Sequence, residues 1–249
     1  MRFDVVTLFP SLFAPHLTEG VTRRAFASGQ VDVRFHNPRD FADGNYLRVD
    51  DRPFGGGPGM VMLAQPLALC LASIHQQRQD DAPVPVVLFS PVGRPLNHAR
   101  VADFAQSQGA VLICGRYEGI DQRLIDTHVT EQISLGDFVL SGGEIAAIAV
   151  LDAVARLQPG VLNDDNSAPQ DSFHPTQGGL LDCPHYTRPQ VWNGQSVPEV
   201  LLSGDHACIK RWRHEQSLAL TQHLRPDLLN PTQHDRNVTA DPPRNRQQP

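Results

Sequence analysis

Short apolar runs alternate with helical patterns along the first two thirds of this chain. The helical patterns lie at Ser11–Ala27, Ala64–Gln77, Asn97–Gln108 and Glu144–Leu157. The strand-like runs lie at Phe3–Leu8, Val31–Phe35, Val84–Phe89, Ala110–Cys114 and Val129–Ser134. This order is typical of a mostly parallel sheet covered by helices and predicts an α/β domain. The last helical pattern is apolar almost all round, so we expect it to be buried against the sheet or another subunit.

Length and composition narrow the class of protein further. The chain has 249 residues, of which 40% are hydrophobic, enough for one large or two smaller domains. It contains no apolar stretch near the roughly 18 residues that a membrane-spanning helix needs, and its start lacks a signal peptide. We therefore expect a cytoplasmic protein with no membrane partner. The cysteines Cys70, Cys114, Cys183 and Cys208 are scattered and read as small core residues without zinc-type clustering.

The remaining segments predict the domain organisation. Ala42–Gly59 has no period and many Gly, Pro and Asp residues, so we expect a mobile surface loop that acts as a lid. Pro159–Gly179 is also irregular and separates the α/β part from a small, mainly helical part with an amphipathic helix at Asp205–Leu224. Asn230–Pro249 is polar and we expect it to be disordered. The prediction is an α/β domain over 1–160, a linker over 161–179, a helical domain over 180–229 and a tail over 230–249.

Two apolar segments run into glycine turns that contain no lysine. The first is AVLICGRYEGID from Ala110 and the second is ISLGDFVLSGGE ending at Glu144. Glycines that follow strands let backbone groups approach a ligand, and parallel sheets bind ligands at the carboxyl ends of strands. Neither turn matches a Walker A sequence or G-x-G-x-x-G, which argues against an NTPase that binds phosphates through such a loop. The pair predicts one nucleotide-like ligand held mainly by backbone.

Longer segments carry a resemblance to a known family. Three of these segments follow successive predicted strands: SPVGRPL, CGRYEGID and SLGDFVLSGGE. Two more flank them in the sequence, DDRPFGGGPGM before and GLLDCPHYTRP after. Over residues 1–229 the chain resembles bacterial tRNA (guanosine-37-N1)-methyltransferases. The resemblance implies a SPOUT-type α/β methyltransferase domain with a deep trefoil knot and a helical C-terminal domain. It also implies S-adenosylmethionine bound by three loops, Ser90–Arg94, Cys114–Asp121 and Ser134–Gly143.

The resemblance assigns cofactor contacts to residues whose local chemistry suits the ligand. Apolar side chains between glycines offer a slot for adenine, and Glu118 offers a negative charge to the sulfonium and its tail. An alternative for Glu118 is that it caps the helix beginning near Asp121. The implied cofactor residues are Pro91, Gly115, Tyr117, Glu118, Ser134, Leu135, Gly136, Asp137, Phe138, Val139, Leu140, Gly142 and Gly143.

Two further residues receive catalytic roles by resemblance. Methyl transfer to guanine N1 needs a base for the N1 proton and a cation for the charge that accumulates on O6. The resemblance gives the base role to Asp171 and the charge-stabilising role to Arg156. A carboxylate and a bidentate arginine are suitable groups for these tasks. The structural alternatives are an exposed linker aspartate that caps a turn, and an arginine that complements its helix dipole.

The expected partners are tRNA and a second copy of the chain. The resemblance implies the anticodon stem-loop as substrate, a homodimer, and possible use of Mg²⁺, for which the sequence shows no carboxylate cluster. The formal net charge is −6 and the chain has one lysine, so composition alone does not favour nucleic acid. A solvated helix face is the alternative for its C-terminal basic cluster. The candidates for contact with tRNA are Arg52, Arg188, Lys210, Arg211 and Arg213.

Three features depart from the expected family pattern. Val92 stands where the SPVGR turn usually has a polar residue, HPTQGG before Leu180 is longer than usual, and the C-terminal helical region is short. Two rival functions remain open at this point. One is a SPOUT methyltransferase that acts on another RNA position, and the other is a noncatalytic RNA-binding protein that keeps the fold.

Overall fold

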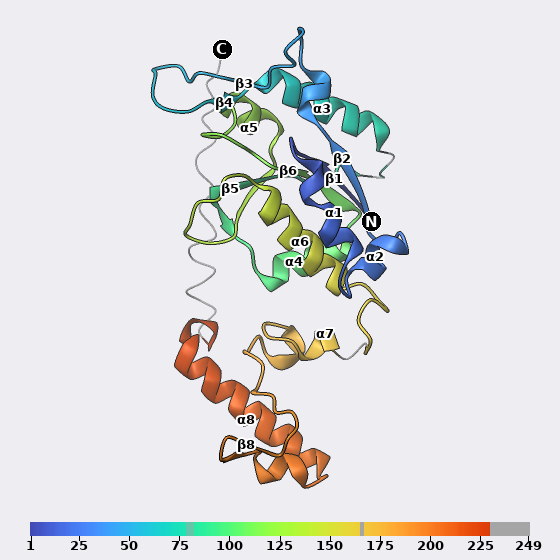
Figure 1. Cartoon of the computed structure of the whole chain (residues 1–249), viewed down its shortest axis with the longest axis vertical. Coiled ribbons are helices and arrows are strands. Elements are labelled where there is room, and N and C mark those ends of the chain that lie inside the picture. The colour runs from blue at the N-terminus through green and yellow to red at the C-terminus, as the bar shows by residue number, and fades with distance from the viewer. Residues whose placement is uncertain (79, 81, 165–166, 230–249) are drawn as a thin grey trace. The chain divides into compact units, whose positions relative to one another are not determined.

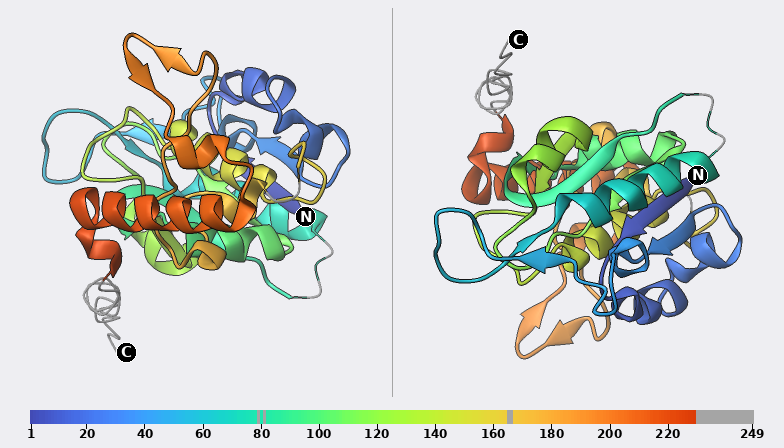
Figure 2. Two further views of the ribbon diagram at one scale, coloured as in Figure 1. Left: turned by 90° about the horizontal axis from the view of Figure 1, so that it is seen from below. Right: turned by 90° about the horizontal axis from the view of Figure 1, so that it is seen from above.

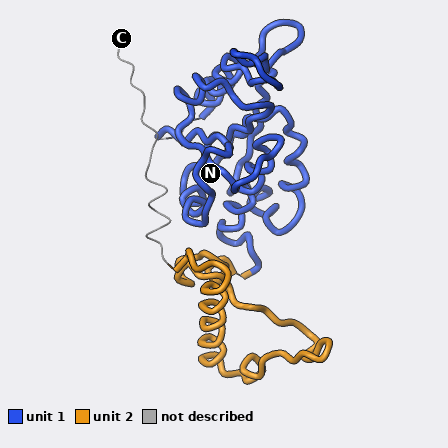
Figure 3. Tube along the Cα trace, turned by 90° about the vertical axis from the view of Figure 1, so that its left-hand side faces the viewer, with its two compact units in different colours: residues 1–163 blue, residues 164–249 orange. Residues whose placement is uncertain are grey.

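The chain divides into two compact units, which are described one at a time. A computed structural model describes residues 1–78, 80, 82–164 and 167–229. Unit 1 covers Met1–Asn163 and unit 2 covers Asp164–Pro249 (Figure 3). The predicted disordered tail, 230–249, lies outside the described residues. The finer division of the chain into a domain, a linker and a helical domain stays a prediction.

Unit 1 is built on a parallel sheet, as the alternating pattern predicted. Its strands are β1 (Arg2–Val6), β2 (Asp32–His36), β5 (Val86–Pro95), β6 (Gly109–Ile113) and β7 (Glu131–Ser134). The sheet has five strands in the order β2-β1-β6-β5-β7, and every neighbouring pair is parallel. The parallel arrangement brings the carboxyl ends of the strands to one edge, where ligands bind in such sheets.

Helices cover both faces of this sheet. On β6 the side chains of Ala110 and Leu112 join one core cluster, and those of Val111 and Ile113 join the other, because successive side chains point to opposite faces. The first cluster packs against α6 (Glu144–Arg156) and α4 (His98–Gln106), and the second against α3 (Ala64–Gln77) and α5 (Gln122–His128) (Figure 1, Figure 2). Burial on both faces explains why the strands read as continuous apolar runs.

The predicted loop at Ser90–Arg94 is wrong, because β5 continues through it. Both Phe89 and Arg94 pair with Ile133 on β7, so the residues between them form an irregularity in the strand. A Cβ on Gly93 would lie 2.5 Å from the Ile133 backbone nitrogen, which explains the glycine at this close approach. The irregularity turns Ser90, Pro91 and Val92 out of the regular ladder.

One helix prediction is wrong and another is confirmed. The predicted helix over Ser11–Ala27 is broken into a 3-10 turn (Pro10–Leu12), α1 (Ala14–Thr18) and α2 (Arg23–Ala27). Gly20 between α1 and α2 has a φ of 73°, a left-handed conformation that ends a right-handed helix. Helix α6 packs against the sheet as predicted, through one face, while Ile145 in its first turn is 57% exposed.

The segment Ala42–Gly59 contains a short strand that the sequence did not predict. Asp50–Asp51 forms strand β3, which pairs antiparallel with β4 (Val61–Met62). Val49, beside β3, is 1% exposed and belongs to the second core cluster. The loop between the strands is exposed, and its mobility and its role as a lid stay predictions.

Unit 2 contains one long helix and several short elements. Helix α8 (His206–Leu224) confirms the predicted helix, although its buried residues are the polar Ser217 and Thr221. The Asp205 side chain accepts hydrogen bonds from the backbone of Ala207 and Cys208 at its start. The short elements are α7 (Ser167–Gln170), the hairpin of β8 (Val191–Trp192) and β9 (Gln195–Ser196), and 3-10 turns at Pro175–Gln177, Glu199–Leu202 and Pro226–Leu229. Across the described ranges, no helix is both long and apolar enough to cross a lipid bilayer.

Candidate functional site

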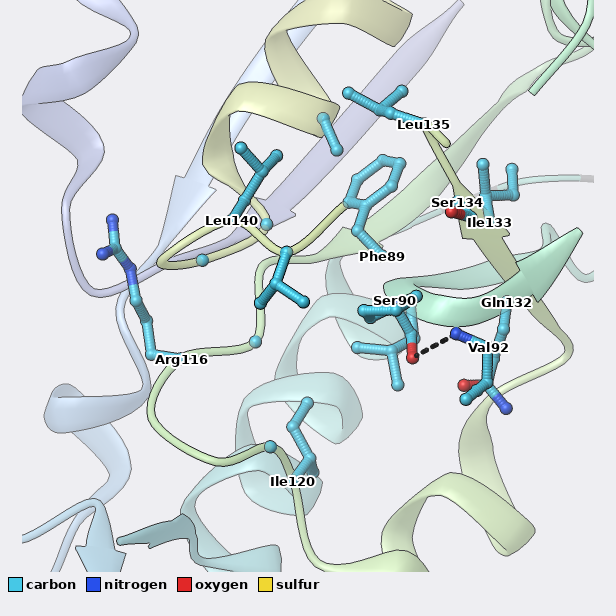
Figure 4. Close-up of a pocket in the computed structure, with 18 of the residues that line it drawn as sticks. Phe89, Ser90, Val92, Arg116, Ile120, Gln132, Ile133, Ser134, Leu135 and Leu140 are labelled. Atoms are coloured by element: carbon cyan, nitrogen blue, oxygen red, sulfur yellow. Dashed lines mark hydrogen bonds between the residues drawn. The ribbon is translucent and has the colours of Figure 1, made fainter. Parts of the chain in front are cut away.

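A cavity of about 520 Å³ opens in unit 1 where β5, β6 and β7 pass into the segments that follow them. Its size falls within the range of about 300–1,000 Å³ that small-molecule sites occupy. In Figure 4, Phe89, Ser90 and Val92 of β5 lie beside the strand β7, where Gln132, Ile133 and Ser134 are labelled. The Val92 backbone nitrogen donates to the Ser90 hydroxyl at 3.4 Å within the β5 irregularity.

The two glycine turns of the sequence meet in the wall of this cavity. The Gly143 N–H donates to the Gly115 carbonyl at 3.0 Å, and Arg116 forms an antiparallel bridge with Gly142. A Cβ on Gly143 would lie 2.8 Å from the Cys114 Cα, closer than real Cβ atoms approach. Glycine is therefore needed at this position so that the two turns can lie against each other.

A third segment supports the first glycine turn from outside. The Glu118 N–H donates to the Met60 carbonyl, and the Met62 N–H donates to the Gly119 carbonyl, both at 2.9 Å. A Cβ on Gly59 would lie 2.3 Å from a carboxylate oxygen of Glu118. The end of the glycine-rich loop thus packs directly against the only acidic side chain among the described residues of the cavity lining.

The geometry of Tyr117 and Asp121 explains how the turn holds its shape. Tyr117 has a φ of 60°, which is unusual for a residue with a side chain, and marks a constrained position. Burial, followed by the nearby Asp50 carboxylate, raises the pKa of Tyr117. The Asp121 side chain, directly before α5, accepts from the Arg123 backbone N–H, so Asp121, not Glu118, is the residue that caps this helix.

The structure brings most of the predicted cofactor residues together. Gly136 and Asp137 are the two that do not line the cavity. Gly136 still helps to close the turn after β7, because the Ser134 hydroxyl donates to its carbonyl at 3.0 Å and accepts from its N–H at 3.1 Å. The predicted residues that line the cavity are Pro91, Gly115, Tyr117, Glu118, Ser134, Leu135, Phe138, Val139, Leu140, Gly142 and Gly143.

Sequence reasoning missed three residues beside the cavity. Arg116 lines it, and the Arg116 guanidinium pairs with Glu144, the first residue of α6, which is 1% exposed. The Thr7 hydroxyl donates to the same carboxylate at 2.9 Å from the end of β1. An acidic residue in the first turn of an otherwise apolar helix was the available signal, because burial of a carboxylate requires partners.

A comparison with known protein families identifies the family to which the chain belongs. The family model described as tRNA (Guanine-1)-methyltransferase TrmD matches residues 1–231. The chain belongs to this family. The match includes all three segments that line the cavity and both described units as far as Leu229.

Curated relatives give the same result. A tRNA (guanine-N(1)-)-methyltransferase of Albidiferax ferrireducens is 71% identical over 235 residues, which cover 94% of each chain. A protein of the same name from Polaromonas sp. is 65% identical over 96% of this chain and 93% of its own. Another from Thiobacillus denitrificans is 56% identical over 94% of this chain and 99% of its own. The chain is therefore similar to members of the tRNA (Guanine-1)-methyltransferase family along nearly their whole length.

The two residues predicted for catalysis in this family lie in different units. Arg156 is the last residue of α6 in unit 1 and is half-buried. Asp171 follows α7 in unit 2, is also half-buried, and its N–H donates to the Ala168 carbonyl at 3.2 Å. The long HPTQGG segment closes on itself, because the Phe173 N–H donates to the Leu180 carbonyl at 2.9 Å. Their catalytic roles stay predictions.

The residues predicted to contact tRNA are all exposed. Arg52 follows β3 in unit 1, and Arg188 precedes the β8–β9 hairpin in unit 2. Lys210, Arg211 and Arg213 lie on α8 in unit 2. Exposure fits both tRNA contact and the alternative of a solvated helix face, so these assignments stay predictions.

One group in unit 2 has the geometry of a metal-binding cluster. The candidate ligand atoms of Asp182, Cys183 and His185 lie within 4.8 Å of one another, which the sequence reading of isolated cysteines did not anticipate. The group offers one carboxylate, one thiol and one imidazole, whereas Mg²⁺ prefers oxygen ligands. It therefore does not match the magnesium site implied by the resemblance.

Proposed function

We propose that this chain transfers the methyl group of S-adenosylmethionine to N1 of guanosine 37 in tRNA. Membership of the tRNA (Guanine-1)-methyltransferase family supports methyl transfer to N1 of guanine in tRNA. The observation that carries the rest is the cavity at the ends of β5, β6 and β7, where the two glycine turns meet. This is the place where a parallel sheet binds a nucleotide-like ligand.

The cavity fits an adenosine-containing methyl donor. Leu135, Phe138 and Leu140 supply apolar surface for a purine, and the neighbouring turns supply backbone donors and acceptors. Glu118 supplies a negative charge close to where a cationic ligand would lie. S-adenosylmethionine, when bound, supplies an electrophilic methyl group on a sulfonium.

The chemical step needs a base and a cation from this chain. Asp171 accepts the proton from guanine N1, which frees the nitrogen lone pair to attack the methyl carbon. The N1–methyl bond forms as the sulfur–methyl bond breaks, and S-adenosylhomocysteine leaves. Arg156 donates to guanine O6, where negative charge accumulates as the proton leaves.

The working assembly is a homodimer that contains the knotted SPOUT domain. Exposed apolar side chains near the cavity and on α6 support an interface, because Phe138 is 55%, Val139 is 83% and Ile145 is 57% exposed. In this arrangement Asp171 of one copy serves the cofactor cavity of the other. Mg²⁺ is an additional expected requirement, with no site assigned to it.

The substrate is the anticodon stem-loop, contacted by exposed basic residues. The target guanosine leaves its stack to reach the cavity, at a cost of a few kcal/mol that is smallest in an unpaired loop. Arg52, Arg188 and the basic residues of α8 contact phosphates and fix the position of the stem-loop.

Label transfer tests the proposal. The purified chain is incubated with methyl-labelled S-adenosylmethionine and a tRNA that carries either guanosine or adenosine at position 37. Label should appear only in the guanosine transcript and at N1 after nucleoside digestion. Transfer to both transcripts would indicate another target position. Binding of tRNA without transfer would indicate a noncatalytic RNA-binding protein.

A further inference from the structure

A buried ion pair lies beside the cofactor cavity and is not explained by the proposed chemistry. Glu144 begins α6, and its side chain is 1% exposed. The carboxylate is 2.9 Å from a terminal guanidinium nitrogen of Arg116, and a second nitrogen of Arg116 donates to it at 3.2 Å. The Thr7 hydroxyl donates to it at 2.9 Å. The helix N-terminus adds a favourable field for this negative charge.

Arg116 is held away from the interior of the cavity by this pair. Its guanidinium also donates to the Ser141 carbonyl at 3.2 Å and lies 4.5 Å from the centre of the Phe9 ring. In Figure 4 the Arg116 side chain lies at one side of the cavity and points away from Ser90 and Val92. A Cβ on Gly142 would lie 2.3 Å from Arg116 and 2.6 Å from the Glu144 carboxylate. Glycine at position 142 is therefore what allows the two charged groups to meet here.

The pair changes the charge that a bound ligand experiences. Among the described residues that line the cavity, the charged ones are Arg116 and Glu118. Glu144 cancels the positive charge of Arg116 within the protein, which leaves the negative charge of Glu118 to act on the ligand. S-adenosylmethionine carries one positive charge more than S-adenosylhomocysteine, because only the methylated sulfur is a sulfonium. An uncompensated positive charge in the wall would repel the sulfonium of the donor, a repulsion that the product does not experience.

We propose that Glu144 is a positioning residue that holds Arg116 out of the interior of the cavity and cancels its charge, so that the site prefers the donor, which carries a sulfonium, to the product, which lacks it. This inference rests on the proposed function, since it takes S-adenosylmethionine as the ligand. Preference for the donor matters to an enzyme of this kind because the product occupies the same cavity after each turnover.

Titration calorimetry at pH 8 with both ligands tests the inference. E144Q keeps the shape of the side chain and a hydrogen-bond acceptor for Thr7 and Arg116, but removes the compensating charge. We expect its affinity for S-adenosylmethionine to fall about tenfold more than its affinity for S-adenosylhomocysteine. R116Q makes the opposite change in charge, so its ratio of donor to product affinity should rise above that of the unaltered protein.

A matched control separates charge from general destabilisation. Glu131 on β7 pairs with Arg100, whose Nε lies 3.0 Å from its carboxylate, and it does not line the cavity. E131Q therefore breaks a similar ion pair and should leave the ratio of the two affinities unchanged. T7V removes a hydrogen bond to Glu144 without changing charge, and it should weaken both ligands to the same extent. Thermal unfolding of each variant identifies any that fails to fold.

Each result of the affinity measurements leads to one conclusion about the inference. Equal loss of donor and product affinity in E144Q, or no loss in either, overturns the inference and leaves Glu144 as a structural residue. If E144Q does not fold, R116Q decides, and a ratio that stays the same or falls overturns the inference. Failure of the unaltered protein to bind S-adenosylmethionine would instead remove the proposed function.

Discussion

The two units differ in how much of their side-chain surface they bury. Unit 1 encloses two clusters of apolar side chains, with Phe3, Leu112 and Ile113 fully buried on the two faces of the sheet. Among the described residues of unit 2, the buried ones are Leu180, Cys183, Ser217 and Thr221. Thr221 is fully buried, and its hydroxyl accepts from the Leu181 N–H at 3.0 Å and donates to the Ser217 carbonyl at 2.7 Å.

This difference matches the tasks proposed for the two units. The cavity residues lie on a sheet with a large core, which fixes their geometry to the accuracy that ligand binding requires. The proposed base and most of the proposed tRNA contacts lie on elements with few buried neighbours, where local motion costs less. Apart from Arg156 and Arg52, which are proposed to act on guanine and tRNA, changes in unit 1 should therefore act on cofactor binding and stability. Changes in unit 2 should act on turnover and tRNA binding.

The sharpest test of this division is Asp171 in unit 2. D171A should lower kcat by about a thousandfold, because a positioned general base contributes about 10²–10⁴-fold. Its affinity for S-adenosylmethionine should stay within about twofold, since the cavity belongs to unit 1. Single-turnover methylation and calorimetry measure the two quantities. D227A, in the same unit, is the control and should retain turnover; an equal loss in both variants would remove Asp171 from the mechanism.

The corresponding change in unit 1 is G143A. The added Cβ would lie 2.8 Å from the Cys114 Cα and 3.3 Å from the Gly115 nitrogen, so the two glycine turns must move apart. We expect affinity for S-adenosylmethionine to fall by up to about a hundredfold, in line with an overpacking cost of about 1–3 kcal/mol. Calorimetry gives the affinity, and the melting temperature shows whether the fold persists. Unchanged affinity in a folded variant would show that the contact between the turns is not needed for binding.

A buried charge in unit 1 should act on stability alone. Asp4 on β1 is fully buried; burial would raise its pKa, but hydrogen bonds from His36, Arg2 and Arg78 lower it to about 2. Because the folded-state pKa lies below the usual aspartate value of 3.8, the stabilisation is present above about pH 4 and is lost as pH falls toward 2. The shift corresponds to about 2 kcal/mol.

Urea unfolding of D4N across this pH range measures the effect. The difference in the free energy of unfolding between the unaltered protein and D4N should be at least about 2 kcal/mol at pH 7 and should shrink between pH 4 and pH 2. A difference that does not change with pH would show that Asp4 contributes through packing and not through its charge. Cofactor affinity of D4N at pH 7 should stay the same as long as the variant is folded.

The smallest expected effect concerns the exposed basic residues of α8. Replacement of Lys210, Arg211 and Arg213 by alanine should weaken tRNA binding several-fold. It should also reduce the slope of log affinity against log salt concentration by about 2, because each of the three residues would contribute about 0.7 through one single-strand phosphate contact. R34A removes an exposed arginine from β2 in unit 1 and is the control. If both variants give the same slope, the α8 residues are a solvated face.

Much of unit 1 could be predicted from its sequence because the local hydrophobic pattern of its strands agrees with their burial in the sheet. The strand runs at Phe3–Leu8 and Ala110–Cys114 correspond to β1 and β6, with small differences at their ends. The helix over Ser11–Ala27 failed because Gly20 breaks a pattern that remains apolar on both sides of it. The loop over Ser90–Arg94 failed because strand pairing with β7 resumes after the irregularity, and no local signal reports a partner strand.

The sequence by itself determined the alternation of strands and helices, the two glycine turns and the family, since each depends on neighbouring residues or on long ordered segments. Only the tertiary structure decided that Gly143 lies against Gly115 and that Glu144, Thr7 and Arg116 meet beside the cavity. Thr7 and Glu144 are separated by 137 positions, and their contact exists because β1 and the start of α6 converge at one edge of the sheet. The spacing of residues along the chain does not predict such a long-range contact. The free energy of burying a carboxylate nevertheless depends on the partners that this contact provides.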